Sequence, residues 1–200
     1  MLTPRIFQLF DSSLPIGSFN HSYGVEEAYY SNLDIKSFIE DIFKNVILPG
    51  DVAIVKIAYD DPYRADEIAY ASKLTAELKN ATVYLGNSLA SLGICENEFI
   101  QKVKKGETYG TYPVVVAVCC KELGISKEDC MVGLAYSELA QLVFASVRLN
   151  AIDFVEGQRL ISRLLGELKV TEITEFKPFS PVLDKLSKNH EIREPKVFMS

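Results

Sequence analysis

The stretch DIKSFIEDIFKNVIL, residues 34–48, indicates the fold class because its apolar residues recur at helical spacing. These residues stand three and four positions apart, at Ile35, Phe38, Ile39, Ile42, Phe43 and Val46. Asp34 is a residue type that caps helix N-termini, while Pro49 and Gly50 are typical of a helix end. We therefore expect an amphipathic helix that ends before Pro49 and packs one face into a core.

Helical patterns also dominate the residues around this stretch. DVAIVKIAYDD, residues 51–61, has the β-branched residues of a strand but also keeps helical spacing. Residues 63–92 are rich in Ala, Leu, Glu and Lys and contain no proline, which predicts one long helix or two abutting helices, interrupted near Asn80 or Gly86. A short polar helix is expected to end at Gly106.

The second half of the chain has clearer signals for where helices begin. VVVAVCCKELG, residues 114–124, could be a buried strand, but Pro113 suits a first helical turn and favours a helix. Ser126 opens a capping box, and Ser180 with Pro181 marks the start of a last helix. The sequence therefore predicts an all-α fold: a single compact domain of about eight to ten helices over residues 1–190, followed by a flexible C-terminal tail at 191–200.

Composition argues against several classes of partner. Acidic residues outnumber basic ones by 27 to 21, and the longest basic cluster is Lys104 with Lys105, so we expect no nucleic-acid binding. No run of about 18 apolar residues and no signal-peptide pattern is visible, which predicts a soluble, cytoplasmic chain with no membrane partner. The four cysteines show no CxxC spacing, and we expect them to be reduced.

The opening stretch SLPIGSFNHSYGVEEA, residues 13–28, holds the side chains an active site could use. A small helical hydrolase would use His21 with Ser18 or Ser22, oriented by Asp11. Serines at a helix start more commonly serve as caps, and there is no GxSxG elbow, so catalysis is the less favoured interpretation. No GxxxxGK[ST] or GxGxxG phosphate loop is present either.

A metal site would draw on His21, His190 and the cysteines, since imidazole and thiolate suit Zn or Ni. No two of these residues stand at ligand spacing along the chain, so we expect no built-in metal centre. A direct nickel-binding chaperone that uses these side chains stays open as a further alternative.

The same opening stretch is better explained by its shape. Pro15 fixes the backbone, Gly17 permits a positive φ, and Gly24, expected inside the following helix, lets another helix approach closely. Phe19 and Tyr23, four residues apart, are expected on one helical face. This shape fits either packing within the domain or a contact surface for a partner.

Several stretches, taken in order, resemble the urease accessory protein UreF family. They are FQLFDSSLPIGSFNHSYGVEEAY (residues 7–29), the long segment from YPVVVAVCC to FVEGQRLI (112–161) and FSPVLDKLSKNHEIREPKVFMS (179–200). The chain departs from the family pattern at Ala53, where a proline is usual, and before Gly86.

The resemblance implies an all-helical, non-enzymatic chaperone for nickel delivery to urease. A protein of this family is expected to form a homodimer, to bind a UreD/UreH-type accessory protein partly through its C-terminal region, and to recruit a UreG-type GTPase to the urease apoprotein. Nickel would be the cargo of that complex, with no cofactor bound by the chain itself.

The resemblance also indicates which residues contact partners. The residues that match family motifs are Pro15, Gly17, Phe19, Ser22, Gly24, Glu26, Arg148, Gln158, Val197, Phe198 and Met199. Arg148 fits an interface, where its guanidinium can hold a carboxylate, as well as it fits an internal helix end. Residues 197–199 are expected to become ordered when the UreD-type partner binds.

Overall fold

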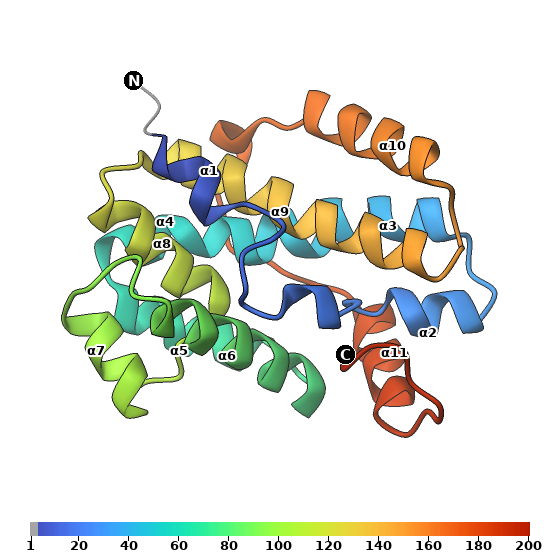
Figure 1. Ribbon diagram of the computed structural model, residues 1–200, viewed down its shortest axis with the longest axis horizontal. Coiled ribbons are helices and arrows are strands. Elements are labelled where there is room, and N and C mark those ends of the chain that lie inside the picture. The colour runs from blue at the N-terminus through green and yellow to red at the C-terminus, as the bar shows by residue number, and fades with distance from the viewer. Residues whose placement is uncertain (1–3) are drawn as a thin grey trace.

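The computed structural model describes residues 4–200, and these residues form one all-α domain with no strand among them (Figure 1). Its α-helices are α1 (Arg5–Leu9), α2 (Val25–Tyr30), α3 (Ile35–Ile42), α4 (Ala53–Asp60), α5 (Pro62–Ser72), α6 (Ala76–Ser91), α7 (Glu98–Lys105), α8 (Tyr112–Glu122), α9 (Lys127–Arg148), α10 (Phe154–Gly166) and α11 (Pro181–Glu191). Three further elements are the 3-10 turns η1 (Ser18–Asn20) and η3 (Val170–Glu172) and the π-helix η2 (Phe43–Val52). Because α3, η2 and α4 run on without a break, the described residues make ten separate helical rods. The prediction of an all-α single domain of about eight to ten helices is confirmed.

The expected helix end before Pro49 is wrong. Asp34 caps α3 as predicted, but the backbone stays helical through Pro49 as η2 and continues into α4. Proline has no N–H to donate within the helix, and the wider π-helical turns accommodate it. The extended segment 173–180 lies along η2, where the N–H of Lys177 donates to the Pro49 carbonyl (2.8 Å) and the N–H of Phe179 to the Asn45 carbonyl (3.4 Å). Tertiary contacts thus supply donors that the helix itself lacks.

The break predicted within residues 63–92 lies elsewhere than expected. It falls between α5 and α6 at residues 73–75, and neither Asn80 nor Gly86 interrupts α6. Thr75 caps α6 with its side chain, while Lys73 turns inward to a buried carboxylate. The capped starts at Ser126 and Ser180 and the helix end at Gly106 are confirmed.

Helix α9 forms the centre of the domain. It contacts α8, α10, η2 and α4, while α11 packs at one end against α2 and α6 (Figure 1). By length and composition α9 is the one described helix that could cross a membrane, but 56% of its most apolar window is buried inside the domain. Such burial is typical of a core helix.

The cysteines differ from the prediction that all four are reduced. Cys95, in the loop after α6, lies against α8 and forms a disulfide with Cys119, with the two Cα atoms 5.3 Å apart. Cys120 and Cys130 are free thiols in the core. The sequence spacing concealed this pair because its members come from different elements.

Candidate partner-binding site

Two glycines shape the opening motif where it meets other helices. Gly17 precedes η1 and Gly24 precedes α2, with φ values of +88° and +86°. A Cβ atom on Gly17 would lie 2.7 Å from Tyr84 Cε1, and one on Gly24 would lie 2.7 Å from Leu183 Cδ1. The positive φ predicted for Gly17 is confirmed, whereas Gly24 caps α2 rather than lying inside it. Both positions need glycine for conformation and for space.

Phe19 and Tyr23 do not share a helical face as predicted. Phe19 lies in η1 and is 62% exposed, whereas Tyr23 has a positive φ of 53° and turns inward. The Tyr23 hydroxyl accepts a hydrogen bond from Lys73 Nζ (3.0 Å) and donates one to Asp51 Oδ2 (3.3 Å). Phe19 therefore lies at the surface, whereas Tyr23 is half-buried.

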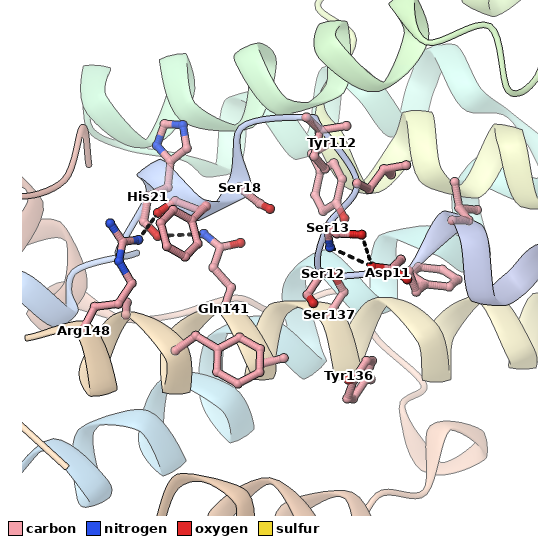
Figure 2. Close-up of a pocket in the computed structure, with 18 residues that line it drawn as sticks. Asp11, Ser12, Ser13, Ser18, His21, Tyr112, Tyr136, Ser137, Gln141 and Arg148 are labelled. Atoms are coloured by element: carbon pink, nitrogen blue, oxygen red, sulfur yellow. Dashed lines mark hydrogen bonds between the residues drawn. The ribbon is translucent and has the colours of Figure 1, made fainter. Parts of the chain in front are cut away.

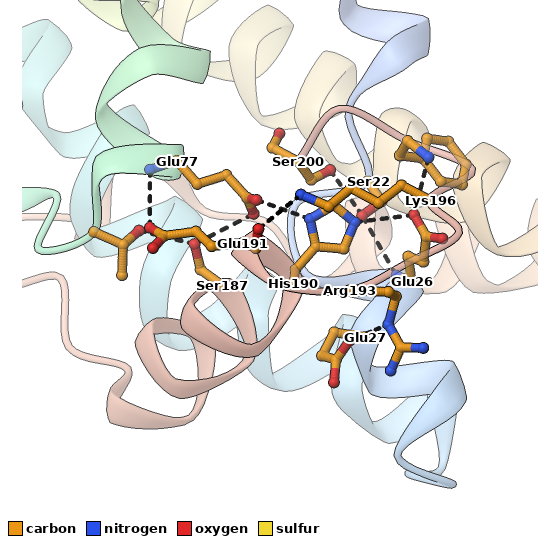
Figure 3. A network of polar contacts seen from close by, with 12 residues as sticks. Ser22, Glu26, Glu27, Glu77, Ser187, His190, Glu191, Arg193, Lys196 and Ser200 are labelled. Atoms are coloured by element: carbon orange, nitrogen blue, oxygen red, sulfur yellow. Dashed lines mark hydrogen bonds and ion pairs between the residues drawn. The ribbon is translucent and has the colours of Figure 1, made fainter.

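Glu26 binds the tail of the chain through its side chain. Its carboxylate is fully buried, and its oxygens accept the N–H of Val197 (2.8 Å) and the N–H of Phe198 (2.9 Å). Oε2 also lies 3.1 Å from Nε2 of His190 in α11 (Figure 3). Three donors around one buried carboxylate satisfy it without contact with water.

His190 joins two carboxylates inside the domain. Its Nδ1 atom lies 2.8 Å from Glu77 Oε2 in α6, while Nε2 faces Glu26 (Figure 3). Burial alone would lower the pKa of His190, but hydrogen bonds to Glu77 and Glu26 outweigh burial, and the pKa is raised. A ring that donates from both nitrogens is the charged imidazolium, which compensates the charge of the carboxylates.

Residues 199 and 200 pair with the opening motif. The Ser200 carbonyl accepts from the backbone N–H of Ser22 (2.5 Å) and from its hydroxyl (2.9 Å). The Met199 N–H donates to the Asn20 carbonyl (2.7 Å), and Ser200 Oγ lies 2.6 Å from His21 Nδ1. The structure therefore places the segment expected to be a flexible tail on the domain; its flexibility stays a prediction.

Arg148, at the end of α9, contacts two phenylalanine rings. Its guanidinium carbon is 3.5 Å from the ring centroid of Phe19 and 4.4 Å from that of Phe198. Nη1 donates to the Phe19 carbonyl, and burial lowers the pKa of Arg148. Within residues 4–200 no carboxylate pairs with this guanidinium. Arg148 therefore has an internal role and also an unneutralised charge at the surface.

A groove opens beside this arginine. It lies between the segment that follows α1 and the exposed face of α9, and has a volume of about 210 Å³ (Figure 2). Phe10, Ile16 and Phe144 contribute apolar walls to the groove. Arg148 and Asp11 are charged residues in its lining. A mostly apolar groove with a few charged groups is suited to binding a segment of another protein.

The predicted partner-binding residues divide between interior and surface. The buried ones are Ser22, Gly24, Glu26 and Phe198. The exposed or partly exposed ones are Pro15, Gly17, Phe19, Arg148, Gln158, Val197 and Met199. Gln158 lies on α10, and no hydrogen bond or ion pair in the described chain joins it to the others. Partner binding by these eleven residues stays a prediction.

The sequence analysis missed the groups that hold the tail. The sequence pointed to His190 as a possible metal ligand or as a ring near the end of the last helix, and no local pattern pointed to Glu77 or Arg193. Arg193 Nε donates to Glu27 Oε2 at 2.5 Å, beside the Glu26 cluster (Figure 3). These partners lie more than 100 residues apart in sequence, so no local spacing could have revealed them.

The residues of the alternative hydrolase do not assemble into a triad. The Asp11 carboxylate accepts from the N–H and hydroxyl of Ser13 (2.7 and 2.5 Å), and Ser22 Oγ donates to Ser200. Across residues 4–200, no side-chain hydrogen bond joins His21 to Ser18, Ser22 or Asp11; the one His21–Ser18 bond is between backbone groups, from the His21 N–H to the Ser18 carbonyl (3.1 Å). Ser18 and His21 both line the groove, but their side chains are not hydrogen-bonded to each other (Figure 2). The geometry gives no support to nucleophilic catalysis here.

The metal alternative lacks a cluster of ligands as well. No group of three or more His, Cys, Asp or Glu side chains in the described part of the chain is arranged to hold a metal ion. His21 and His190 face different partners, and the free cysteines are buried elsewhere. Direct nickel binding stays an untested alternative.

Comparison with known proteins identifies the family. The UreF family model matches residues 30–165, which is more than half of the chain. The chain belongs to the UreF family. This confirms the resemblance that the opening, central and C-terminal stretches indicated.

Relatives in the UreF family extend the match beyond residues 30–165. Proteins described as urease accessory protein UreF from Yersinia pseudotuberculosis serotype I (strain IP32953) and Yersinia pestis (strain Pestoides F) are each 26% identical to the chain over 211 residues. The same identity is found for the protein of that description from Yersinia enterocolitica serotype O:8 / biotype 1B. Each alignment covers 93% of this chain and 92% of the relative, so the likeness extends over nearly the whole domain.

Proposed function

We propose that this chain is a urease accessory protein that acts as a scaffold for nickel insertion. It assembles, as a homodimer, with a UreD/UreH-type protein and a UreG-type GTPase on the urease apoprotein, in the cytoplasm. The chain performs no chemistry of its own in this proposal: it regulates GTP-dependent delivery by its partner, and nickel is the cargo of the complex. Membership of the UreF family supports the accessory role.

The observation that carries the scaffold proposal is the surface around Arg148. Phe19 from the opening motif and Phe198 from the tail both contact one guanidinium. Three segments that are distant in sequence thus form one surface, next to the groove along α9. An exposed guanidinium with no carboxylate partner, stacked on aromatic rings and next to apolar surface, is a common anchor in protein interfaces.

Co-expression with the UreD-like and UreG-like proteins of the same source tests the proposal. Affinity capture followed by light scattering should show a stoichiometric complex with the full chain. Deletion of residues 191–200 should weaken capture of the UreD-like partner. A folded chain that captures neither partner would rule the scaffold function out.

A pair of matched arginine variants shows whether the Arg148 surface makes the contact. Arg148→Ala should weaken capture of at least one partner by roughly tenfold or more, as expected for a central interface arginine. Arg159→Ala removes an exposed arginine on α10 and should leave capture unchanged. If both variants capture the partners equally well and keep their helicity, Arg148 does not lie in the interface.

A further inference from the structure

A second, smaller cavity lies beneath the tail and adjoins the groove, with which it shares His21, Tyr112 and Gln141 in its lining. Its volume is about 30 Å³, and it is enclosed by residues of the opening motif, η2, α6, α8 and α9 together with Ser200. Its polar lining includes His21, Asp51, Glu138 and Gln141.

Two buried polar atoms at this cavity have no partner. They are Nε2 of His21 and Oε2 of Glu138, the two buried side-chain nitrogen or oxygen atoms left without a hydrogen bond among the described residues. The two side chains are 5% and 9% exposed. Leaving such a group unsatisfied costs about 1–3 kcal/mol, so a small polar molecule that bonds both atoms would be favoured at this cavity.

The size and lining of the cavity indicate which kind of molecule it can hold. A volume of 30 Å³ exceeds the roughly 10–15 Å³ that one water molecule needs and is far below the roughly 300 Å³ of an organic ligand site. A metal ion would find fewer than three carboxylate, imidazole or thiolate ligands in any one place within residues 4–200. We propose that this cavity is an internal water site in which ordered water links Nε2 of His21 to Oε2 of Glu138.

The protonation states of His21 and Glu138 are consistent with a water molecule that bridges them. Burial lowers the pKa of His21, with Glu77 acting in the opposite direction, so its ring is neutral and one nitrogen accepts. Burial, and then the charge of Asp51, raises the pKa of Glu138 well above its ordinary value, although Lys73 opposes this. A neutral carboxyl provides an O–H donor, and water can accept from it while donating to the imidazole.

The other titratable groups around Glu138 do not replace that water. Lys73 donates to both oxygens of Asp51 at 2.8 Å, so this pair is satisfied by itself. The hydroxyl of Tyr23 is hydrogen-bonded to both members of this pair. Burial raises the pKa of Tyr112 on α8, so this side chain is uncharged at neutral pH. Glu138 is left as a carboxyl without a protein partner.

A crystal structure of the full chain at high resolution tests the proposal directly. Density for water is expected within hydrogen-bonding distance of both unpartnered atoms in the wild type and in Glu138→Gln, which keeps a polar group of the same size. In Glu138→Met, which keeps the volume but removes the polar partner, that density should be lost. An empty cavity in the wild type, or a metal ion or organic molecule there, would overturn the proposal.

A thermal measurement in solution provides a second, independent test. A carboxyl whose pKa is raised by folding loses its contribution to stability as pH rises above the ordinary value near 4.3. Relative to the wild type, Glu138→Gln should therefore gain about 3 °C or more in Tm between pH 5 and pH 8. Glu67→Gln, at an exposed position on α5, is the matched control and should show no such gain. A difference between Glu138→Gln and wild type that does not change with pH would contradict a neutral, water-bound Glu138.

Discussion

Nε2 of His190 lies 3.1 Å from Oε2 of Glu26, across 164 residues of sequence. The same carboxylate accepts the N–H groups of Val197 and Phe198. One buried glutamate in α2 therefore fixes the position of both the last helix and the tail. Through Phe198, this contact also places one of the two rings that lie against Arg148.

Glu26→Ala should strongly destabilise the domain. The substitution leaves a buried imidazole and two backbone N–H groups without their acceptor, and removal of one partner from a buried ion pair costs about 3–5 kcal/mol. Urea denaturation at pH 7 measures the loss. Glu67→Ala, at an exposed and unpaired position, should change the free energy of unfolding by less than about 0.5 kcal/mol. Similar losses for the two variants would show that the Glu26 cluster is not stabilising.

The contribution of His190 to the stability of the domain should depend on pH. Because folding raises its pKa, the stabilisation is fully present below the unfolded value of about 6.5 and is lost as pH rises through the folded value. The stability difference between the wild type and His190→Asn should therefore narrow when pH increases from 6 to 9. Thermal melts of both proteins across this range measure it. A difference that widens with pH would mean that the ring is neutral when buried.

Amide hydrogen exchange in the tail should depend on the contact between Glu26 and His190. The amides of Val197 and Phe198 donate to a buried carboxylate, so they should exchange with deuterium more slowly than the exposed residues before them. In His190→Asn the protection of this peptide should decrease, whereas α9 should keep its protection. Fast exchange of residues 197–200 in the wild type would support the expectation of a flexible tail instead.

The buried pair of Lys73 and Asp51 should tolerate loss of both charges better than loss of one. Lys73→Met leaves a carboxylate that is 5% exposed without its cation, which should cost about 3–5 kcal/mol. Adding Asp51→Asn removes that charge and should recover more than about 1 kcal/mol. Urea denaturation of the single and double variants measures both steps. A double variant less stable than Lys73→Met would mean that Asp51 stabilises the fold without its lysine.

Gly24→Ala should cost more than its backbone conformation alone predicts. Gly24 and Gly106 both have positive φ, but a Cβ on Gly24 would meet Leu183 at 2.7 Å, whereas nothing lies within 4 Å of one on Gly106. Gly106→Ala thus measures the conformational cost alone, and Gly24→Ala should lose about 1–3 kcal/mol more because of the clash. Equal losses in chemical denaturation would show that α11 shifts to make room.

The sequence predicted many features that depend on neighbours three or four residues away, although it missed the helix start capped by Thr75 and wrongly placed Phe19 and Tyr23 on one helical face. Periodicity around residues 34–48, the caps at Asp34, Ser126 and Ser180, and the helix stop at Gly106 were all predicted correctly. It failed at Pro49, where donors from segment 173–180 sustain a π-helix that local rules would end.

The sequence by itself determined an all-α domain and, through its motifs, the resemblance to the UreF family. Only the tertiary structure decided what the chemistry-bearing residues do. Glu26 and His190 meet across 164 residues of sequence, Arg148 contacts phenylalanines from two distant segments, and Glu138 lines a small cavity. The physical reason is that helix formation is a local property of the backbone, whereas burial and pairing of charges depend on which helices pack together.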